Sequence, residues 1–453
     1  MASEWQKYRL DDIAEVIDSL HKSPSYSDHG YSMVRVTDIR PGFLNLNNTF
    51  KVTFSIFDEF TKKYKPKKGD IVFSRVGSYG ISSYVSTDEP FCLGQNTVVI
   101  NPKIDERFLY LTLQSASVRH QIESVAVGTT QKTISLKSIK NLEILCPEVQ
   151  EQKAIAHILG SLDDKIELNR QMNATLEAMA QALFKSWFVD FDPVIDNALA
   201  AGNPIPDELE AKAAARQALG DARKPLPEDI RSLFPNAFVF TEEMGWIPEG
   251  WEILSVSEAI TVNPSVQLKK GEVAPFIDMK ALPTSGYAID DVSRKAYAGG
   301  AKFKNKDVLL ARITPCLENG KTGVVDFLKK GESGFGSTEF IILRGRNGLN
   351  MPFVACLARD DKFRTHCIQS MVGSSGRQRV QNACFDSFYL CLPKSEKIKQ
   401  QFHDSTNGFF EKITTLKNET NSLTQLRDTL LPKLLSGELR IPEADELVEE
   451  SVA

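Results

Sequence analysis

The chain lacks a hydrophobic run long enough to cross a membrane. It contains no stretch of roughly 18 apolar residues, and its N-terminus has no apolar core of the kind found in signal peptides. Its seven cysteines include no CxxC pair and no zinc-ligand spacing, which is typical of reduced cytosolic thiols. We therefore expect a cytoplasmic protein without a membrane or metal partner, whose cysteines pack in hydrophobic cores.

A recognisable catalytic constellation is also missing. The nearest approach is PCLENGKT at residues 315–322, which begins with Pro where the tight turn of a phosphate loop needs Gly. A group of acids between Pro206 and Lys212 falls within two turns of one Ala-rich helical pattern, so we expect a solvated helix face there. The sequence predicts a protein that is not an enzyme and carries no cofactor. Nucleotide binding at 315–322 is the alternative.

The net negative charge of the chain comes from two segments. The 453 residues, enough for two or three domains, carry a net charge of −5. Residues 190–250 carry −7 and residues 438–450 carry −5, so the rest of the chain carries +7. Because local patches matter more than the total for attracting phosphates, the composition does not exclude a nucleic-acid partner.

What the chain does contain is a long internal repeat. Trp5 opens one copy and Trp251 opens the other. Four segments then recur in the same order: GDIVFSR at 69–75 with NKDVLLAR at 305–312, GQNTVVI at 94–100 with GSTEFII at 336–342, GTTQ at 128–131 with GSSG at 373–376, and LCP at 145–147 with CLP at 391–393. Solenoid units are only about 20–50 residues long, so this repeat indicates a duplicated domain. Two such modules are suited to reading two places on one extended partner.

Each copy ends in a long helical pattern. Apolar residues step by three and four from residue 148, as at Ile155, Leu159, Leu162 and Ile166. This pattern predicts a helix of about 40 residues, roughly 60 Å long. A second helix should end near 432–437, and the two should pair as a coiled coil. Asn169 and Asn173 interrupt the first seam, where they either fix the register or mark a water-facing stretch.

The remaining segments predict mixed α+β domains made of short strands, turns and a helix over 108–125. Strand patterns occur at 70–76, 97–100 and 139–146, with a polar loop at 128–135. The expected division is a first mixed domain at 1–147, a long helix at 148–190, an acidic connector at 191–245 with a short helix from Pro206 to Leu219, a second mixed domain at 246–393, a second long helix at 394–437, and an acidic, mobile tail at 438–453.

This order resembles the specificity subunit of type I restriction-modification enzymes over essentially the whole chain. The local phrases that carry the resemblance are the Trp5 and Trp251 openings, GWIPEGW at 245–251, PEVQEQKAI at 147–155, ALFKSWFVDF at 182–191 and LLSGEL at 434–439. The resemblance implies two target-recognition domains separated by two long antiparallel coiled-coil helices, related by a pseudo-twofold repeat. It also implies a non-catalytic subunit that reads a split site in double-stranded DNA. Its partners would be two methyltransferase subunits and, in the full complex, the restriction motor-nuclease subunits.

The candidate DNA-binding residues lie in polar segments, most of which recur in both copies. Sequence readout needs Arg, Lys, Asn, Gln, Ser or Thr side chains that can enter the major groove. The predicted residues are Thr129, Thr130, Gln131 and Lys132 in the first loop, Ser374, Ser375, Arg377, Gln378 and Arg379 in the second, and Arg75, Gln95, Asn96, Arg312, Lys321, Lys65, Lys67 and Lys68 elsewhere.

Each of these candidates has a simpler alternative. The loops at 128–133 and 373–379 can be ordinary polar loops. Arg75 and Arg312 can equally form structural salt bridges, Lys321 can be a plain surface lysine, and the lysine run at 62–68 can be a solvated turn. For the whole chain, the rival interpretation is a two-module coiled-coil adaptor that binds proteins instead of DNA.

Overall fold

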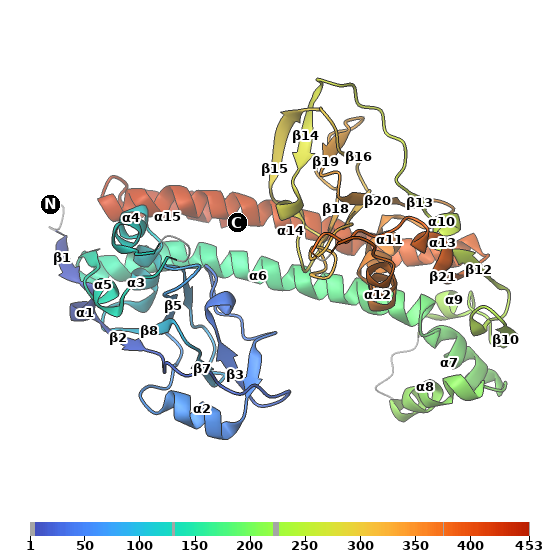
Figure 1. Cartoon of the computed structure of the whole chain (residues 1–453), viewed down its shortest axis with the longest axis horizontal. Helices are drawn as coiled ribbons and strands as arrows, with labels where there is room; N and C mark the ends of the chain where they lie inside the picture. Colours follow the sequence, from blue (N-terminus) through green and yellow to red (C-terminus); the bar gives the residue numbers. More distant parts are fainter. Residues whose placement is uncertain (1–4, 129–131, 221–225, 375, 453) are drawn as a thin grey trace. The chain divides into compact units, whose positions relative to one another are not determined.

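The computed structural model describes residues 5–128, 132–220, 226–374 and 376–452 and divides the chain into two compact units. Unit 1 comprises Met1–Arg170 with Asn418–Ala453, and unit 2 comprises Gln171–Lys417. Two long helices, α6 (Val149–Phe188) and α14 (Glu396–Ser436), each contribute one half to each unit (Figure 1). The predicted 40-residue helix and the predicted end of the second helix are both confirmed.

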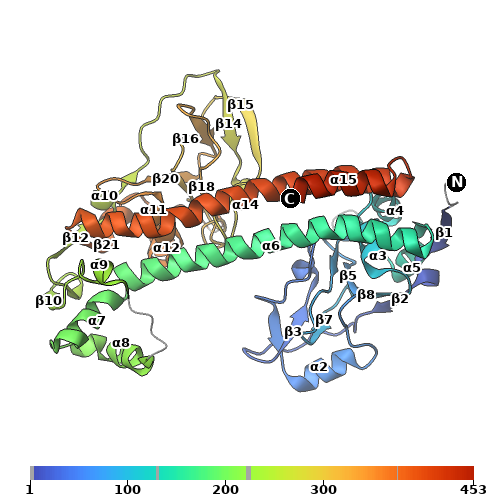
Figure 2. The ribbon, with the colours of Figure 1, turned by 180° about the vertical axis from the view of Figure 1, so that it is seen from behind.

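The two long helices pair in an antiparallel manner within each unit. In unit 1 the beginning of α6 packs against the end of α14, and the core between them contains Ile155, Leu159, Leu162, Ile166, Leu423, Leu430 and Leu434. In unit 2 the end of α6 packs against the beginning of α14 through Phe184, Trp187, Phe402 and Phe410. Figure 2 shows the same pairing from behind. Of the two seam asparagines, Asn169 is buried and Asn173 is half-buried.

The mixed domain of unit 1 is built on two small sheets. The first has the strand order β2-β8-β5-β6 and is antiparallel throughout. In the second, β3 lies between β4 and β7 and pairs with β7 in parallel. The strands are β1 (Gln6–Arg9), β2 (Ala14–Asp18), β3 (Tyr31–Val34), β4 (Phe50–Val52), β5 (Ile71–Ser74), β6 (Ser82–Tyr84), β7 (Phe91–Leu93), β8 (Thr97–Pro102) and β9 (Glu143–Cys146), and β1 pairs with β9. The helices are α1 (Leu10–Ile13), α2 (Phe54–Thr61), α3 (Glu106–Leu113), α4 (Ala116–Val125) and α5 (Leu136–Lys140).

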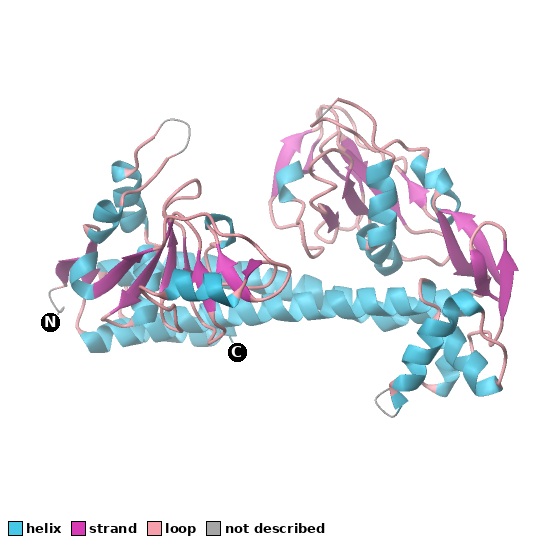
Figure 3. Ribbon diagram, turned by 60° about the horizontal axis from the view of Figure 1, so that its bottom comes forward, coloured by secondary structure: helices cyan, strands magenta, loops and turns pink. Residues whose placement is uncertain are grey.

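Unit 2 repeats this topology with one additional strand, β16, at the edge of its second sheet. Its sheets have the orders β13-β20-β17-β18 and β15-β14-β19-β16, and β14 again pairs with β19 in parallel. The strands are β12 (Trp251–Ser255), β13 (Thr261–Val262), β14 (Val273–Ile277), β15 (Val292–Ala296), β16 (Ala301–Phe303), β17 (Val308–Ala311), β18 (Thr322–Val324), β19 (Gly334–Gly336), β20 (Phe340–Arg344) and β21 (Tyr389–Pro393). The helices are α10 (Val256–Ala259), α11 (Met351–Arg359), α12 (Asp361–Gln369) and α13 (Cys384–Ser387). Figure 3 shows the strands of both domains in one colour.

The connector before this domain is mostly helical. It contains α7 (Asp192–Ala201), α8 (Asp207–Ala218) and α9 (Glu228–Arg231), followed by a hairpin of β10 (Phe238–Thr241) and β11 (Gly245–Pro248). The predicted short helix from Pro206 to Leu219 is confirmed as α8. All seven cysteines, which lie in described parts of the chain, are free, and six of them are buried. In the described residues, no helix combines the length and apolarity needed to span a membrane.

Three expectations about local structure are wrong. The strand predicted over 139–146 begins only at Glu143, because residues 136–140 form α5, which Ser135 caps by accepting a hydrogen bond from the Ser138 N–H. The helix predicted over 108–125 is two helices, because the side chain of Ser115 accepts a hydrogen bond from the backbone N–H of Val118 and caps α4. The tail predicted to be mobile forms α15 (Ile441–Val452), in which Ala444 and Val448 are buried in the core of unit 1. Apolar residues four apart give this acidic segment one face that can pack.

Candidate nucleic-acid interface

Three segments meet at one end of the main sheet in each unit. In unit 1, the backbone N–H of Arg75 donates to the Asn96 carbonyl (2.9 Å), and the N–H of Ile134 donates to the Arg75 carbonyl (3.0 Å). The corresponding segments of unit 2 make the same contacts through Arg312, whose N–H donates to the Glu339 carbonyl at 2.9 Å. The strand end, the turn before the next strand and the segment after the polar loop therefore form one repeated constellation.

The polar loops are closed at their base by backbone bridges. Val127 pairs with Thr133 in unit 1, and Val372 pairs with Arg379 in unit 2. Thr133 also pairs with Val76, so the loop is joined to the residue after Arg75. The repeated sequence at 128–131 and 373–376 thus belongs to equivalent loops. Thr129, Thr130, Gln131 and Ser375, which were predicted to bind DNA, lie outside the described residues.

The two strand-end arginines have different environments. In unit 1, Arg75 Nη1 donates to both carboxylate oxygens of Asp18, at 2.7 and 2.8 Å, and its side chain is only 14% exposed. This is the structural salt bridge considered as the alternative for Arg75. Arg312 donates from Nε to the Val380 carbonyl at 3.2 Å, and its charge contributes to lowering the pKa of Glu339.

The loop of unit 2 is anchored by both backbone and side-chain contacts. The Gln378 N–H donates to Thr314 Oγ1 (3.0 Å), and Arg379 forms an ion pair with Glu339 (2.6 Å). Hydrogen bonds from Arg379 are the main cause that holds the pKa of the Glu339 carboxyl below its usual value. Ser374 and Arg377 are exposed in this loop, and the Arg377 N–H donates to the Ser374 carbonyl at 2.9 Å.

The other predicted residues are placed as follows. Gln95 Nε2 donates to Ser23 Oγ at 3.5 Å, and Asn96 has the left-handed φ of 63°. Lys132 is exposed, with its ammonium 5.9 Å from the centre of the Tyr79 ring. Lys321 Nζ donates to the Met279 carbonyl at 2.8 Å, so this amine has a partner within the fold.

The lysine run does not join the constellation around Arg75. Lys65, Lys67 and Lys68 lie in the connection that precedes β5, whereas Arg75 follows the last residue of that strand. Four residues of extended chain separate the two ends by roughly 13 Å. The structure therefore places these lysines at the opposite end of β5 from the loop.

One arginine at this constellation was not among the predicted residues. Arg35 follows β3 and forms an ion pair with Asp38, and its guanidinium lies 3.9 Å from the centre of the Phe50 ring. The N–H of Gly94 donates to the Val34 carbonyl, which puts the turn at 94–96 beside Arg35. In the sequence, the only signal was an Arg three residues before an Asp, which is common in any charged turn.

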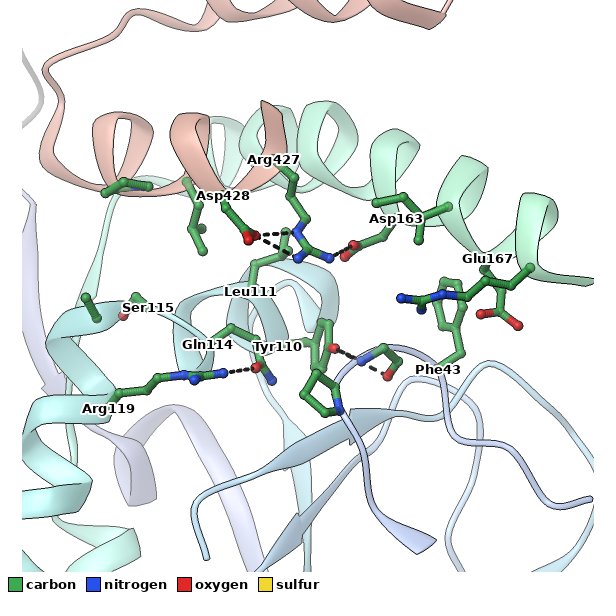
Figure 4. A pocket seen from close by; sticks show the side chains of 17 residues that line it. Phe43, Tyr110, Leu111, Gln114, Ser115, Arg119, Asp163, Glu167, Arg427 and Asp428 are labelled. Carbon is green, nitrogen blue, oxygen red and sulfur yellow. Dashed lines mark hydrogen bonds and ion pairs between the residues drawn. The ribbon is translucent and has the colours of Figure 1, made fainter. Parts of the chain in front are cut away.

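Unit 1 also contains a pocket of about 380 Å³ beside its helix pair, lined by both apolar and charged side chains (Figure 4). Arg427 lies there between Asp163 and Asp428, each at 2.7 Å. The Gly42 N–H donates to Tyr110 Oη at 2.6 Å on the opposite wall. Burial raises the pKa of the Asp163 carboxyl, and the neighbouring Arg427 charge only partly offsets this effect.

Comparisons with known proteins agree on one family. Residues 2–178 match the family described as Type I restriction modification DNA specificity domain. The chain is 27% identical to the Type I restriction enzyme HindI specificity subunit of Haemophilus influenzae, over 96% of this chain and 100% of that protein. It is 23% identical to the Type I restriction enzyme MjaIX specificity subunit of Methanocaldococcus jannaschii, over 83% of this chain and 79% of that protein.

A solved structure is also similar along its length. It is described as the crystal structure of a Type-I restriction-modification system S subunit from M. genitalium, with 19% identity, a TM-score of 0.49 and 96% coverage of both chains.

Proposed function

We propose that this chain, which belongs to the family of type I restriction-modification specificity subunits, is the DNA-recognition and scaffolding subunit of such a complex. Each mixed domain reads one half of a bipartite, asymmetric site in double-stranded DNA. The paired helices set the distance between the half-sites and dock the other subunits. Recognition and scaffolding are the tasks of this chain, and methyl transfer belongs to its partners.

The repeated constellation is the observation that carries this proposal. In both units, a strand-end arginine, a turn and a polar loop are joined by the same backbone hydrogen bonds. Their side chains differ, because Arg379 in unit 2 stands where unit 1 has Thr133. The same backbone arrangement thus carries different side chains in the two units. This difference supports a DNA site whose two halves have different base sequences.

The proposed division of labour follows the domains. Residues 1–147 and 246–393 are the target-recognition domains, and residues 148–190 and 394–437 are the spacer helices. Residues 191–245 form the connector and residues 438–453 the C-terminal segment. The proposed partners are double-stranded DNA, two methyltransferase subunits and, in the full complex, the restriction subunits.

The decisive experiment is to produce the chain with its methyltransferase and to map methylated adenines in cellular DNA. We expect one bipartite motif with two different half-sites. DNA binding by the purified complex should weaken steeply with salt, because phosphate contacts release counterions. A complex that assembles but neither binds DNA nor methylates a bipartite motif would overturn the proposal in favour of a protein-binding adaptor.

A further inference from the structure

Two arginines, one in each unit, are held side-on by a carboxylate. Arg35 donates from Nε to Asp38 Oδ2 at 3.1 Å and from Nη2 to Asp38 Oδ1 at 3.2 Å. Arg379 donates from Nε to Glu339 Oε2 at 2.9 Å and from Nη2 to Glu339 Oε1 at 2.6 Å. In both pairs the carboxylate occupies the Nε side of the guanidinium, which is the strong bidentate arrangement.

Both pairs lie at the same turn of the repeat, although the arginines come from different elements. A Cβ atom placed on Gly94 would lie 3.5 Å from Arg35 Cγ, so Arg35 borders the turn at 94–96. Glu339 belongs to the equivalent turn at 336–339, since its carbonyl takes the place of the Asn96 carbonyl in the backbone contacts. Each unit therefore has one side-on arginine that borders this turn.

The two guanidinium groups are fixed before any ligand arrives. Arg35 lies against the Phe50 ring, and Phe50 lies against Tyr26 with ring centres 4.6 Å apart. The backbone of Arg379 is held by its bridges to Ile313 and Val372. The side chains of Arg35 and Arg379 nevertheless remain 31% and 43% exposed. A group that is both ordered and accessible loses little conformational freedom when it binds.

The edge of each guanidinium that faces away from its carboxylate carries only hydrogen-bond donors. Within the described residues, neither Nη1 has a hydrogen-bond partner, so Nη1 and the second N–H of Nη2 form a free pair of parallel donors. In the major groove, guanine offers two acceptors, O6 and N7, at the matching spacing. Adenine pairs its N7 acceptor with an N6 donor, and cytosine offers a donor, so neither matches this edge.

We infer that Arg35 and Arg379 each read a guanine, one in each half-site, and that Asp38 and Glu339 are positioning residues that aim them. This inference rests on the proposed DNA-recognition function and adds a base identity to it. Arg75 is not a reader of this kind, since its Nη1 is already bound to Asp18.

The test compares methylation motifs of the intact complex carrying Arg35→Lys, Arg379→Lys or Glu339→Gln. Lysine keeps the charge but replaces the rigid planar pair of parallel donors with a single ammonium on a flexible stem, which the carboxylate cannot aim in the same way. Each Arg→Lys variant should relax one guanine position in one half-site, with discrimination falling about 5- to 150-fold. The two variants should affect different half-sites. Glu339→Gln should relax the same position as Arg379→Lys, because it removes the charge that aims the guanidinium.

A matched control is available in the connector. Arg216 is also held side-on by Asp196, from Nε at 2.6 Å and from Nη2 at 2.5 Å, but its Nη1 is bound to Asp192 at 2.8 Å and it lies on α8, not at the repeated turn. Arg216→Lys should leave the motif unchanged. A relaxed base position in this variant would show that loss of any such pair disturbs recognition, and would overturn the inference.

Two further outcomes would also overturn it. One is a wild-type motif with no guanine in one of its half-sites. The other is an equal loss of methylation on all sequences in the Arg→Lys variants, which is the behaviour of a phosphate contact. Failure of the underlying function looks different, because the wild-type complex would then show no bipartite motif at all.

Discussion

Arg427 of α14 donates from Nη1 to Asp163 of α6 at 2.7 Å, joining residues that are 264 positions apart in the chain. Both belong to unit 1, and the Asp163 side chain is only 9% exposed. A buried ion pair contributes little net stability because both charges lose their hydration, but removal of one partner leaves an uncompensated charge. Among the leucines of the seam, this pair therefore favours one register of the helices.

Arg427→Leu should destabilise unit 1 because it leaves the Asp163 carboxylate buried without its partner. Removal of one partner of a buried ion pair usually costs about 3–5 kcal/mol. We expect a smaller loss of about 2–3 kcal/mol in the free energy of unfolding, because Arg427 is itself partly exposed. The double variant Asp163→Leu with Arg427→Leu should recover most of this loss. Denaturant unfolding followed by helical circular dichroism measures both. Equal stability of the single and double variants would contradict this account.

The Arg427→Leu defect should depend on pH. Burial already raises the pKa of Asp163, so folding favours its protonated form. A raised carboxyl pKa means that the penalty is absent below the unfolded pKa and grows as the pH rises through the folded one. The difference in unfolding free energy between variant and wild type should therefore be largest at neutral pH and shrink on acidification. A difference that stays constant from pH 7 down to pH 4 would show that lost packing, and not charge, is the cause.

Replacement of Arg377 and Arg379 with Ala should weaken DNA binding and leave methyltransferase docking intact, because we place docking on the helices. Arg377 is exposed at the loop, whereas Arg379 is held by Glu339. If Arg377 contacts a phosphate, Arg377→Ala alone should lower affinity on all sequences and reduce the salt slope by about 1. Binding titrations at several salt concentrations measure this. Unchanged affinity of the double variant at moderate salt would remove both residues from the interface.

Lengthening of both long helices should change the spacing of the methylated motif. Phe184 and Trp187 are buried in the core of unit 2, so an insertion beside them would disrupt packing. The insertions should instead stand at the boundary between the two units in each helix, with four residues added after Arg170 in α6 and four after Lys417 in α14. Four residues add about 6 Å, which corresponds to about one or two base pairs at roughly 3.4 Å each. Motif mapping should show unchanged half-sites with a longer spacer, and an active variant with the original spacer would refute the helices as a ruler.

A fragment that ends after residue 190 should form a symmetric dimer. In the whole chain, unit 1 buries Leu423, Leu430 and Leu434 of α14 against α6. In the fragment, the end of α6 from a second copy would have to replace these residues across a twofold axis. With methyltransferase present, the dimer should modify a symmetric site made of the first half-site and its inverse. Size-exclusion chromatography and motif mapping test this, and methylation confined to asymmetric sites would contradict it.

The duplication and the two long helices could be predicted from the amino-acid sequence alone. Apolar residues at steps of three and four specify a helix from neighbouring positions alone, which is why the bounds of α6 and α14 could be predicted closely. The break at Ser115 and the packed helix α15 were missed. The first depends on one capping hydrogen bond, and the second depends on a core that the rest of unit 1 supplies.

The role of each arginine depends on contacts between residues that are far apart in the chain. Arg75 and Arg379 both follow short polar or strand segments and look equally available in the sequence. Arg75 is bound by Asp18, 57 residues away, whereas Arg379 is held by Glu339, 40 residues away, in a way that leaves one edge open. Arg35 became a candidate only when the fold brought it beside the turn at 94–96. Such pairings depend on which strands are neighbours, and no local pattern of residues encodes that.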